Sequence, residues 1–171
     1  MSVTSRIALR FDILQNKAAD MGTGEQPYAA GINEILWRSG VGYNEADLVF
    51  GDTRSLGTGA NEDLDFVGGF NDAFGTAVSP AKIKAVIIVN NNTDTQTLTL
   101  KSAAANGWAG MLTGNGAGVT VQPGSSQCPG MFCWIAPKGV AITAATADLI
   151  NVLNSAGATV SYSLIVVGTS S

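Results

Sequence analysis

The sequence predicts an all-β protein, an antiparallel sandwich or barrel of about eight or nine short strands. Short runs of apolar residues alternate with polar ones at the period of a β-strand. Turn-forming residues interrupt these runs at intervals of roughly 8–12 residues, as in known sandwiches and barrels. Most of the 21 glycines fall in the interruptions, where turns need backbone conformations that other residues avoid. Little helix is therefore expected.

The N-terminal part of the chain begins with a strand and continues less regularly. Over residues 6–13, apolar residues alternate with charged or small ones, which predicts a strand with one buried face. Residues 15–31 contain repeated glycine and proline breakers and are predicted to form a loop. We expect an N-terminal arm and linker over residues 1–45 and one β-sandwich domain over residues 46–171.

The centre of the chain carries the strongest strand signals. Leu48–Phe50 and Glu62–Phe66 are predicted as short strands. Ile83–Val89 is an almost continuous apolar run, which predicts a strand buried on both faces. A polar turn over residues 90–94 leads into Thr95–Leu100, and these last two strands are expected to pair as a hairpin.

The C-terminal third continues the same pattern. Five further segments are predicted as strands: Val119–Val121, Met131–Ile135, Val140–Thr143, Ala147–Leu153 and Thr159–Val167. The fourth leaves an alternative open, because residues 144–153 also fit a single helix.

The surface is predicted to be nearly neutral. Charged residues make up 13% of the chain and apolar residues 46%, whereas an average globular chain is about 25% charged. A surface of this kind is either solvated by hydroxyl and amide groups or covered by partners, and the second option fits a protein that works in an assembly. The nine basic residues are scattered and the net charge is −4, which argues against binding to nucleic acid or anionic lipid.

Catalysis is not expected. The sequence has no histidine, the commonest general base and metal ligand. The glycine-rich segment 114–118 precedes a strand pattern instead of a helix, so it does not match a nucleotide-binding loop. Acidic residues between 62 and 72 match no calcium loop. No catalytic, cofactor or metal site is predicted, and a glycosidase using two carboxylates is the remaining enzyme alternative.

Two cysteines and two tryptophans leave further alternatives. Cys128 and Cys133 flank a Pro-Gly turn and either form a disulfide or remain free; free thiols are favoured for a protein made in the cytoplasm. Trp134 lies in an apolar strand and is predicted to be core. Trp108 follows Gly107 in a predicted loop, and is the candidate for a glycan-binding platform.

No targeting or membrane segment is expected. Arg6, Arg10 and Asp12 interrupt the apolar residues of the N-terminus, unlike the core of a signal peptide. No stretch reaches the roughly 18 apolar residues of a membrane span. Synthesis in the cytoplasm without a membrane partner is the prediction.

Residues 46–171 contain an ordered series of short segments that a known family shares. In chain order they are Ala46–Leu56, Glu62–Phe66, Asp72–Gly75, Lys82–Val86, Asn90–Thr93, Pro123-Gly124, Ala136-Pro137, Ala144–Leu149, Val160–Tyr162 and Ile165–Gly168. Their order resembles a family of small virion proteins encoded among the head genes of tailed phages. Residues 1–45 are not part of this resemblance.

The resemblance implies a fold, a role and partners. The fold would be a jelly-roll-like β-sandwich, and the role would be capsid decoration or cement on the exterior of a phage head. The partners would be the major capsid protein and further copies of the chain, as a homotrimer or alternatively a homodimer. A tail or baseplate protein, either a tube subunit or a receptor- or glycan-binding tip, is the alternative.

Charged residues are predicted to make the contacts with neighbours. The candidate interface residues are Arg6, Arg10, Asp12, Asp52, Arg54, Glu62, Asp63 and Asp65. Charges at the rim of an interface set orientation more than affinity. The N-terminal arm is expected to reach a neighbouring subunit and to add a strand to the edge of its sheet.

Overall fold

The structure, a computed structural model, describes residues 5–7, 10–19, 22–31, 35–72, 74–112, 116, 118–125 and 127–171. For residues 5–31 the description concerns the backbone, and side chains are described from residue 35 onward. Residues 113–115 and 117, which include most of the glycine-rich segment, lie outside the described residues.

The described residues form strands and no helix. The strands are β1 (Ser5–Ile7), β2 (Arg10–Ala19), β3 (Gly22–Gly31), β4 (Ile35–Trp37), β5 (Leu48–Leu56), β6 (Asn61–Asp65), β7 (Phe70–Asn71), β8 (Ala77–Val78), β9 (Lys82–Asn90), β10 (Leu98–Ser102), β11 (Val119–Val121), β12 (Gly130–Ala141), β13 (Leu149–Asn154) and β14 (Val160–Thr169). Consequently, the part of the chain described here contains no helix long and apolar enough to cross a membrane.

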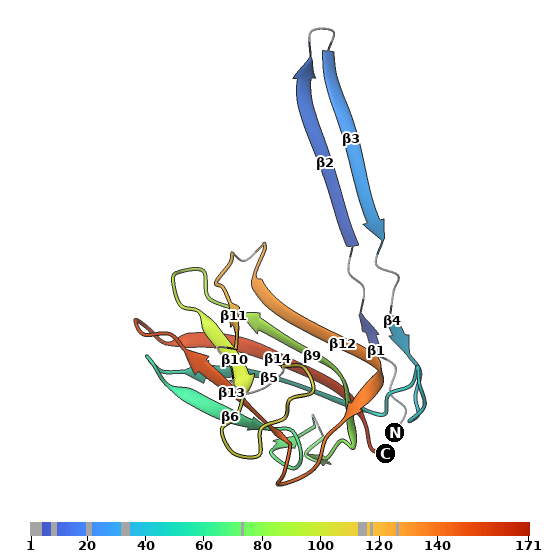
Figure 1. The fold of residues 1–171 in the computed structure, drawn as a ribbon, viewed down its shortest axis with the longest axis vertical. Coiled ribbons are helices and arrows are strands. Elements are labelled where there is room, and N and C mark those ends of the chain that lie inside the picture. The colour runs from blue at the N-terminus through green and yellow to red at the C-terminus, as the bar shows by residue number, and fades with distance from the viewer. Residues whose placement is uncertain are drawn as a thin grey trace.

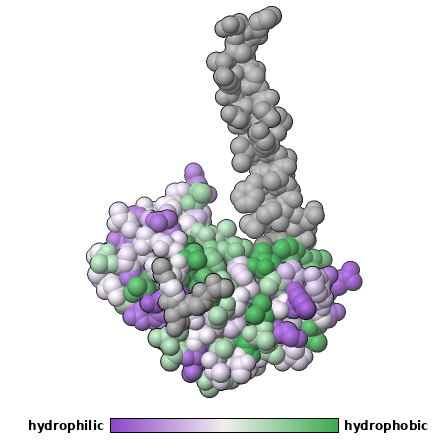
Figure 2. Space-filling model, viewed as in Figure 1, coloured by the Kyte–Doolittle hydropathy of each residue, from purple (hydrophilic) through white to green (hydrophobic). Residues whose placement is uncertain are grey.

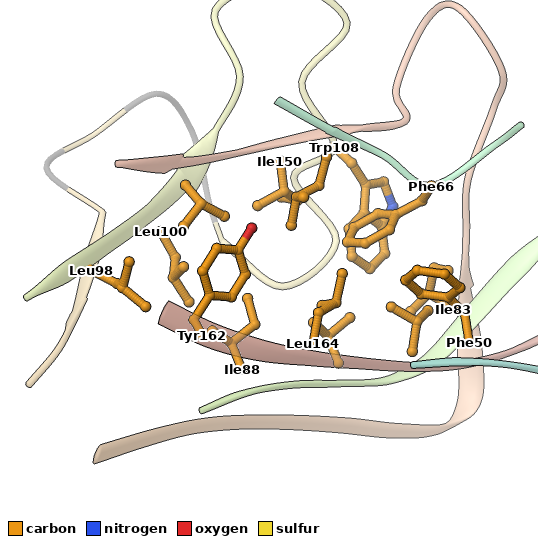
Figure 3. Close-up of a cluster of buried hydrophobic side chains, with 14 of the residues drawn as sticks. Phe50, Phe66, Ile83, Ile88, Leu98, Leu100, Trp108, Ile150, Tyr162 and Leu164 are labelled. Atoms are coloured by element: carbon orange, nitrogen blue, oxygen red, sulfur yellow. The ribbon is translucent and has the colours of Figure 1, made fainter. Parts of the chain in front are cut away.

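Two four-stranded sheets form the body of the molecule. One has the strand order β11-β10-β13-β6 and the other β12-β9-β14-β5. Every neighbouring pair in both sheets is antiparallel. The sheets are stacked (Figure 1), and side chains from both fill the space between them (Figure 3). The predicted all-β, antiparallel, sandwich-like fold is confirmed.

Alternation along the strands places the large apolar side chains between the sheets. Leu98 and Leu100 of β10 and Ile150 of β13 come from one sheet, and Ile88 of β9 and Leu164 of β14 come from the other (Figure 3). All five are fully buried members of one hydrophobic cluster. Full burial of a side chain of this size stabilises the fold by about 1.5–3 kcal/mol.

The pairing predicted for the two central strands is wrong. Ile83–Val89 and Thr95–Leu100 lie largely in β9 and β10, which belong to different sheets. The turn between them crosses from one sheet to the other. Buried Asn90 holds this crossing, because its side-chain amide donates hydrogen bonds to the carbonyl oxygens of Gln96 (2.8 Å) and Val121 (3.4 Å). A polar turn has the same sequence pattern whether it closes a hairpin or joins two sheets.

The alternatives near the C-terminus are resolved in favour of strands. Leu149–Asn154 is β13, so the strand prediction for this segment is confirmed and the helix is excluded. Met131–Ile135 and the first two residues of Val140–Thr143 belong to one strand, β12, whose pairing with β9 is interrupted between Ile135 and Val140.

A second, small hydrophobic cluster lies on the outside of the β12-β9-β14-β5 sheet. Trp37 of β4 and Ala46 pack there against Ala85 of β9 and Val167 of β14. Ile35 also packs against this cluster, so alternate residues of β4 face the sheet. The β1–β4 ribbon is antiparallel and, through β4, covers one end of this outer sheet surface.

Lys84 anchors the segment that follows β4. Its side chain is fully buried, and its Nζ donates hydrogen bonds to the carbonyl oxygens of Gly42, Tyr43 (3.0 Å) and Pro137 (3.1 Å). Both ladders of β9 shift register next to Lys84, as at a β-bulge. The ammonium group therefore connects a central strand to the root of the β1–β4 ribbon and to the interruption in β12.

A long hairpin extends from the ribbon. β2 and β3 pair antiparallel from Arg10 opposite Gly31 to Ala19 opposite Gly22, and they lead away from the sandwich (Figure 1). The loop predicted for residues 15–31 is therefore wrong, because most of this range is strand. The prediction assumed that a strand shows an alternating apolar face and contains no Gly or Pro. A two-stranded hairpin outside the core needs no such face, and its strands tolerate both residues.

Candidate assembly surface

Three of the predicted interface residues meet at the edge where β5 and β6 lie. Arg54 Nε donates to Glu62 Oε2 at 2.9 Å, and Arg54 Nη1 donates to Asp52 Oδ2 at 3.0 Å. The hydroxyl of Tyr162, on β14, donates to Glu62 Oε1 at 2.7 Å. The Arg54 guanidinium also lies over the Phe70 ring, 5.8 Å from its centroid. The network links the edge strands of the two sheets.

Two groups in this network, Tyr162 and Arg54, have raised pKa values. Burial, followed by the hydrogen bond to Glu62, raises the pKa of Tyr162. The hydrogen bond that Arg54 donates to Glu62 is the main cause that raises the pKa of Arg54. The neutral phenol of Tyr162 and the guanidinium cation of Arg54 both donate to the Glu62 carboxylate. This arrangement suits a structural role. Charges that point inward at edge strands also discourage strand addition at that edge.

The other acidic candidates lie outside this network. Asp63 Oδ1 accepts a hydrogen bond from Asn151 Nδ2 at 2.7 Å, on the outside of the β11-β10-β13-β6 sheet. Asp65 Oδ1 accepts from the backbone N–H of Val67 at 2.8 Å. Asp72 Oδ1 closes the following turn by accepting from the backbone N–H of Phe74 and Thr76. Among the described residues, no group of three or more acids and thiols is arranged to hold a metal ion.

The N-terminal candidates are placed only by their strand positions. Arg6 lies on β1 opposite Leu36. Arg10 and Asp12 lie on β2 opposite Gly31 and Ala29, two residues apart and therefore on one face of the hairpin. Their side chains lie outside the described part, and their interface role stays a prediction.

Trp108 does not form an exposed platform. It is only 2% exposed, its Nε1 donates to the Ala141 carbonyl at 2.9 Å, and its ring makes edge contacts with Phe66 and Trp134. The glycan-platform prediction is wrong: Gly107 before Trp108 indicated a loop, but the Trp108 side chain lies in the core. Trp134 packs partly buried against the same core.

The cysteines do not form a disulfide in this structure. Cys128 is exposed and Cys133 is half-buried, and both thiols are free. Burial raises the pKa of the Cys133 thiol, which makes it a poorer nucleophile at neutral pH.

The outside of the β12-β9-β14-β5 sheet carries an apolar surface that the sequence analysis missed. Across the strands, Gly51, Ile165, Ile87 and Cys133 stand side by side. The neighbouring row includes Val89 opposite Met131. We call the following outward residues the apolar face: Val49, Ile87, Val89, Met131, Cys133 and Ile165. Val49, Met131 and Ile165 are 39%, 49% and 40% exposed.

The near-continuous apolar run of β9 was the available signal for this surface. It predicted a strand buried on both faces, and that prediction is only half right. Ile87 and Val89 point outward and are only partly buried, whereas Ala85 is covered by the β4 cluster. A continuous apolar run therefore also fits a strand that has one face in the core and an apolar second face at the surface.

The outside of the other sheet differs in character. There Lys101 stands opposite Asn151, and Asn151 stands opposite Asp63. In the next row, Thr99 stands opposite Thr120. One outer surface of the sandwich is thus largely polar and the other apolar, and hydrophobic residues gather on the sandwich near β1 and β4 (Figure 2).

Comparison with known proteins supplies no relative: no protein-family model, curated protein or solved structure matches this chain.

Proposed function

We propose that this chain is a structural, non-catalytic virion protein that binds the outer surface of a phage head and stabilises it. The resemblance carried by residues 46–171 supports this role. The hairpin formed by β2 and β3 is the observation that carries the proposal furthest. Each strand has ten residues, or about 30 Å at the usual rise.

An isolated two-stranded hairpin is marginally stable at best in water. β2 and β3 contact each other extensively, and no contact of similar extent joins them to another described element. A partner that covers the hairpin would supply the missing stabilisation. The β2–β3 hairpin therefore acts as an arm that reaches a neighbouring molecule, which favours an assembly protein over a solitary enzyme.

The strand order supports assigning the sandwich to the jelly-roll type. Numbering β5, β6 and β9 to β14 in chain order, one sheet runs first, eighth, third, sixth. The other runs second, seventh, fourth, fifth. This is the order that two interleaved Greek keys produce, and jelly rolls recur in viral capsid and lectin domains. A capsid-associated role and a trimer, with a dimer as the alternative, agree with this assignment.

A decoration protein holds a shell together through many modest contacts, because bridging between subunits raises avidity. Asp52, Arg54 and Glu62 are already engaged with one another, so contact with the major capsid protein would use their remaining exposed edges. No chemistry on a substrate is required.

The copy number and position of the protein in purified virions test the proposal. Quantitative mass spectrometry is expected to give a copy number comparable to that of the major capsid protein, and labelling should decorate the head. Particles stripped of the protein should lose heat or osmotic resistance. A few copies confined to the tail would contradict a head role.

A tail-tube subunit is the second candidate, and the same hairpin favours it. Head-to-tail contacts through a protruding element form rings when the rotation between subunits closes. Purified protein that stacks into tubes in the absence of capsid would favour this candidate over decoration. The glycosidase alternative is tested by incubation with capsular polysaccharides: hydrolysis that Glu62→Gln abolishes would overturn the non-catalytic assignment.

A further inference from the structure

We propose that the apolar face is the docking site for the β2–β3 hairpin of a second copy of this chain. The inference rests on the proposed assembly role, and it names the surface and the partner. Four observations on the described residues carry it.

The chemistry of the apolar face fits a dry contact. No charged residue stands in its two uncovered rows, which hold Gly51, Ile87, Cys133 and Ile165, and Thr53, Val89, Met131 and Ser163. Exposed apolar surface that spans several strands marks an interaction site. The exposure of Met131 and Ile165, 49% and 40%, leaves side-chain area available for burial.

The chain already covers one end of the same sheet surface with a two-stranded ribbon. β4 packs Ile35 and Trp37 onto Ala85, Val167 and Ile135, in the row next to Gly51 and Ile165. β2 and β3 continue the chain directly from β1 and into β4. A ribbon laid on the remaining rows would extend an existing mode of packing.

The hairpin has an apolar side over the half nearest the β1–β4 ribbon, beyond which Gln15, Gln26 and Lys17 stand on the same face. Phe11 stands opposite Ala30, and Ile13 stands opposite Tyr28. Strand alternation assigns these four residues to one face, while Arg10 and Asp12 belong to the other. The side with Phe11 and Ile13 is the one expected to meet the apolar face.

The hairpin cannot cover the apolar face of its own molecule in this arrangement, because it leads away from the sandwich (Figure 1). A second copy must provide the occupant. The contact joins different surfaces of the two molecules, so repetition produces a ring or an open chain. Each subunit then donates one hairpin and accepts one.

Two complementary double-substitution variants of the full-length chain test this arrangement. The hairpin variant carries Phe11→Ser and Ile13→Ser and keeps its apolar face. The face variant carries Met131→Glu and Ile165→Glu, at two exposed positions that the core does not need. Leu14→Ser, on the other face of the hairpin, and Val119→Glu, an exposed apolar residue of the other sheet, are the matched controls.

Sedimentation velocity and light scattering report the outcome. Wild type and both controls should self-associate, and each double variant should weaken self-association about 100-fold, the effect of placing unpaired polar groups in an apolar contact. An equimolar mixture of the two double variants should recover a 1:1 complex that does not grow further, since only one hairpin and one face remain intact.

Three results would overturn the inference. They are a monomeric wild type, a face variant that assembles like wild type, and a mixture that stays monomeric. Circular dichroism melts confirm that each variant is folded. These results are independent of virion placement: a protein abundant on the head but monomeric in solution would sink the hairpin contact and leave the decoration role intact.

Discussion

At the scale of single residues, one half-buried carboxylate and one buried ammonium group hold elements that are distant in sequence. Glu62 receives hydrogen bonds from both Arg54 and Tyr162, which lie on neighbouring strands of the opposite sheet. Lys84 donates hydrogen bonds to three carbonyl oxygens. Buried polar groups of this kind cost stability when one partner is removed.

Tyr162→Phe is expected to lower the free energy of unfolding by about 1–2 kcal/mol, because it leaves Glu62 Oε1 without its phenolic donor. Urea denaturation at neutral pH measures the loss. Tyr43→Phe is the matched control, since Tyr43 is 63% exposed, and it should stay within about 0.5 kcal/mol of wild type.

The same hydroxyl predicts a pH dependence. The pKa of Tyr162 is raised in the folded state, first by burial, so the folded protein keeps a proton that the unfolded chain releases above about pH 10. The stabilisation that the Tyr162 hydroxyl contributes is complete below that pH. Above it, the free energy of unfolding falls by at most about 1.4 kcal/mol per pH unit. The stability difference between wild type and Tyr162→Phe should narrow from about pH 8 to about pH 11; a constant difference would contradict it.

Lys84→Met should destabilise the protein by about 2–3 kcal/mol, because three carbonyl oxygens lose a charged donor. Lys138→Met, at an exposed neighbouring lysine, is the control and should be nearly neutral. Thermal or urea unfolding distinguishes them. Equal effects would mean that the buried ammonium is not an anchor.

At the scale of elements, the hairpin and the sandwich depend on different contacts. Replacing residues 10–31 with a short Gly-Ser linker should leave the urea midpoint of the sandwich nearly unchanged, because β2 and β3 make extensive contacts only with each other among the described elements. Self-association measured by sedimentation should be lost. A large fall in the midpoint would show that the hairpin supports its own sandwich.

Sequence patterns predicted the strands of the core and failed for the hairpin outside it, for the pairing of β9 and β10, and for the burial of Trp108. Strands such as β9 and β14 were found because one face must be apolar to be buried. The hairpin was missed because its strands do not pack extensively against the described core, so the sequence of residues 15–31 carries no regular alternation of apolar residues. Trp108 was misplaced because local glycines say nothing about Phe66 and Trp134, which enclose it from elsewhere in the chain.

The sequence predicted which charged residues belong to the candidate site, but it did not predict which of them contact one another. Asp52, Arg54 and Glu62 were identified as charged residues near turns, yet only the stacking of the two sheets brings Glu62 to Arg54 and Tyr162. Asp63 follows Glu62 directly but lies on the opposite side of its strand. Adjacent acids in a strand therefore belong to different surfaces.

At the scale of the whole molecule, the sandwich has two unlike exteriors. The β11-β10-β13-β6 exterior has Lys101, Asn151 and Asp63 in register, and the β12-β9-β14-β5 exterior has the apolar face. A subunit with this polarity has a preferred orientation in any layer. The polar exterior is expected to face solvent, and the apolar face is expected to meet a neighbouring subunit.

The anchoring of Lys84 has a mechanical consequence. A pull on the hairpin passes through the β1–β4 ribbon into the segment that Lys84 holds, and from there into β9. Because β9 is hydrogen-bonded to β12 on one side and β14 on the other, the load enters an interior strand and is shared by two ladders. Tension between linked subunits would then be resisted by both ladders of β9. A force applied to an edge strand would instead break the hydrogen bonds of its single ladder one after another.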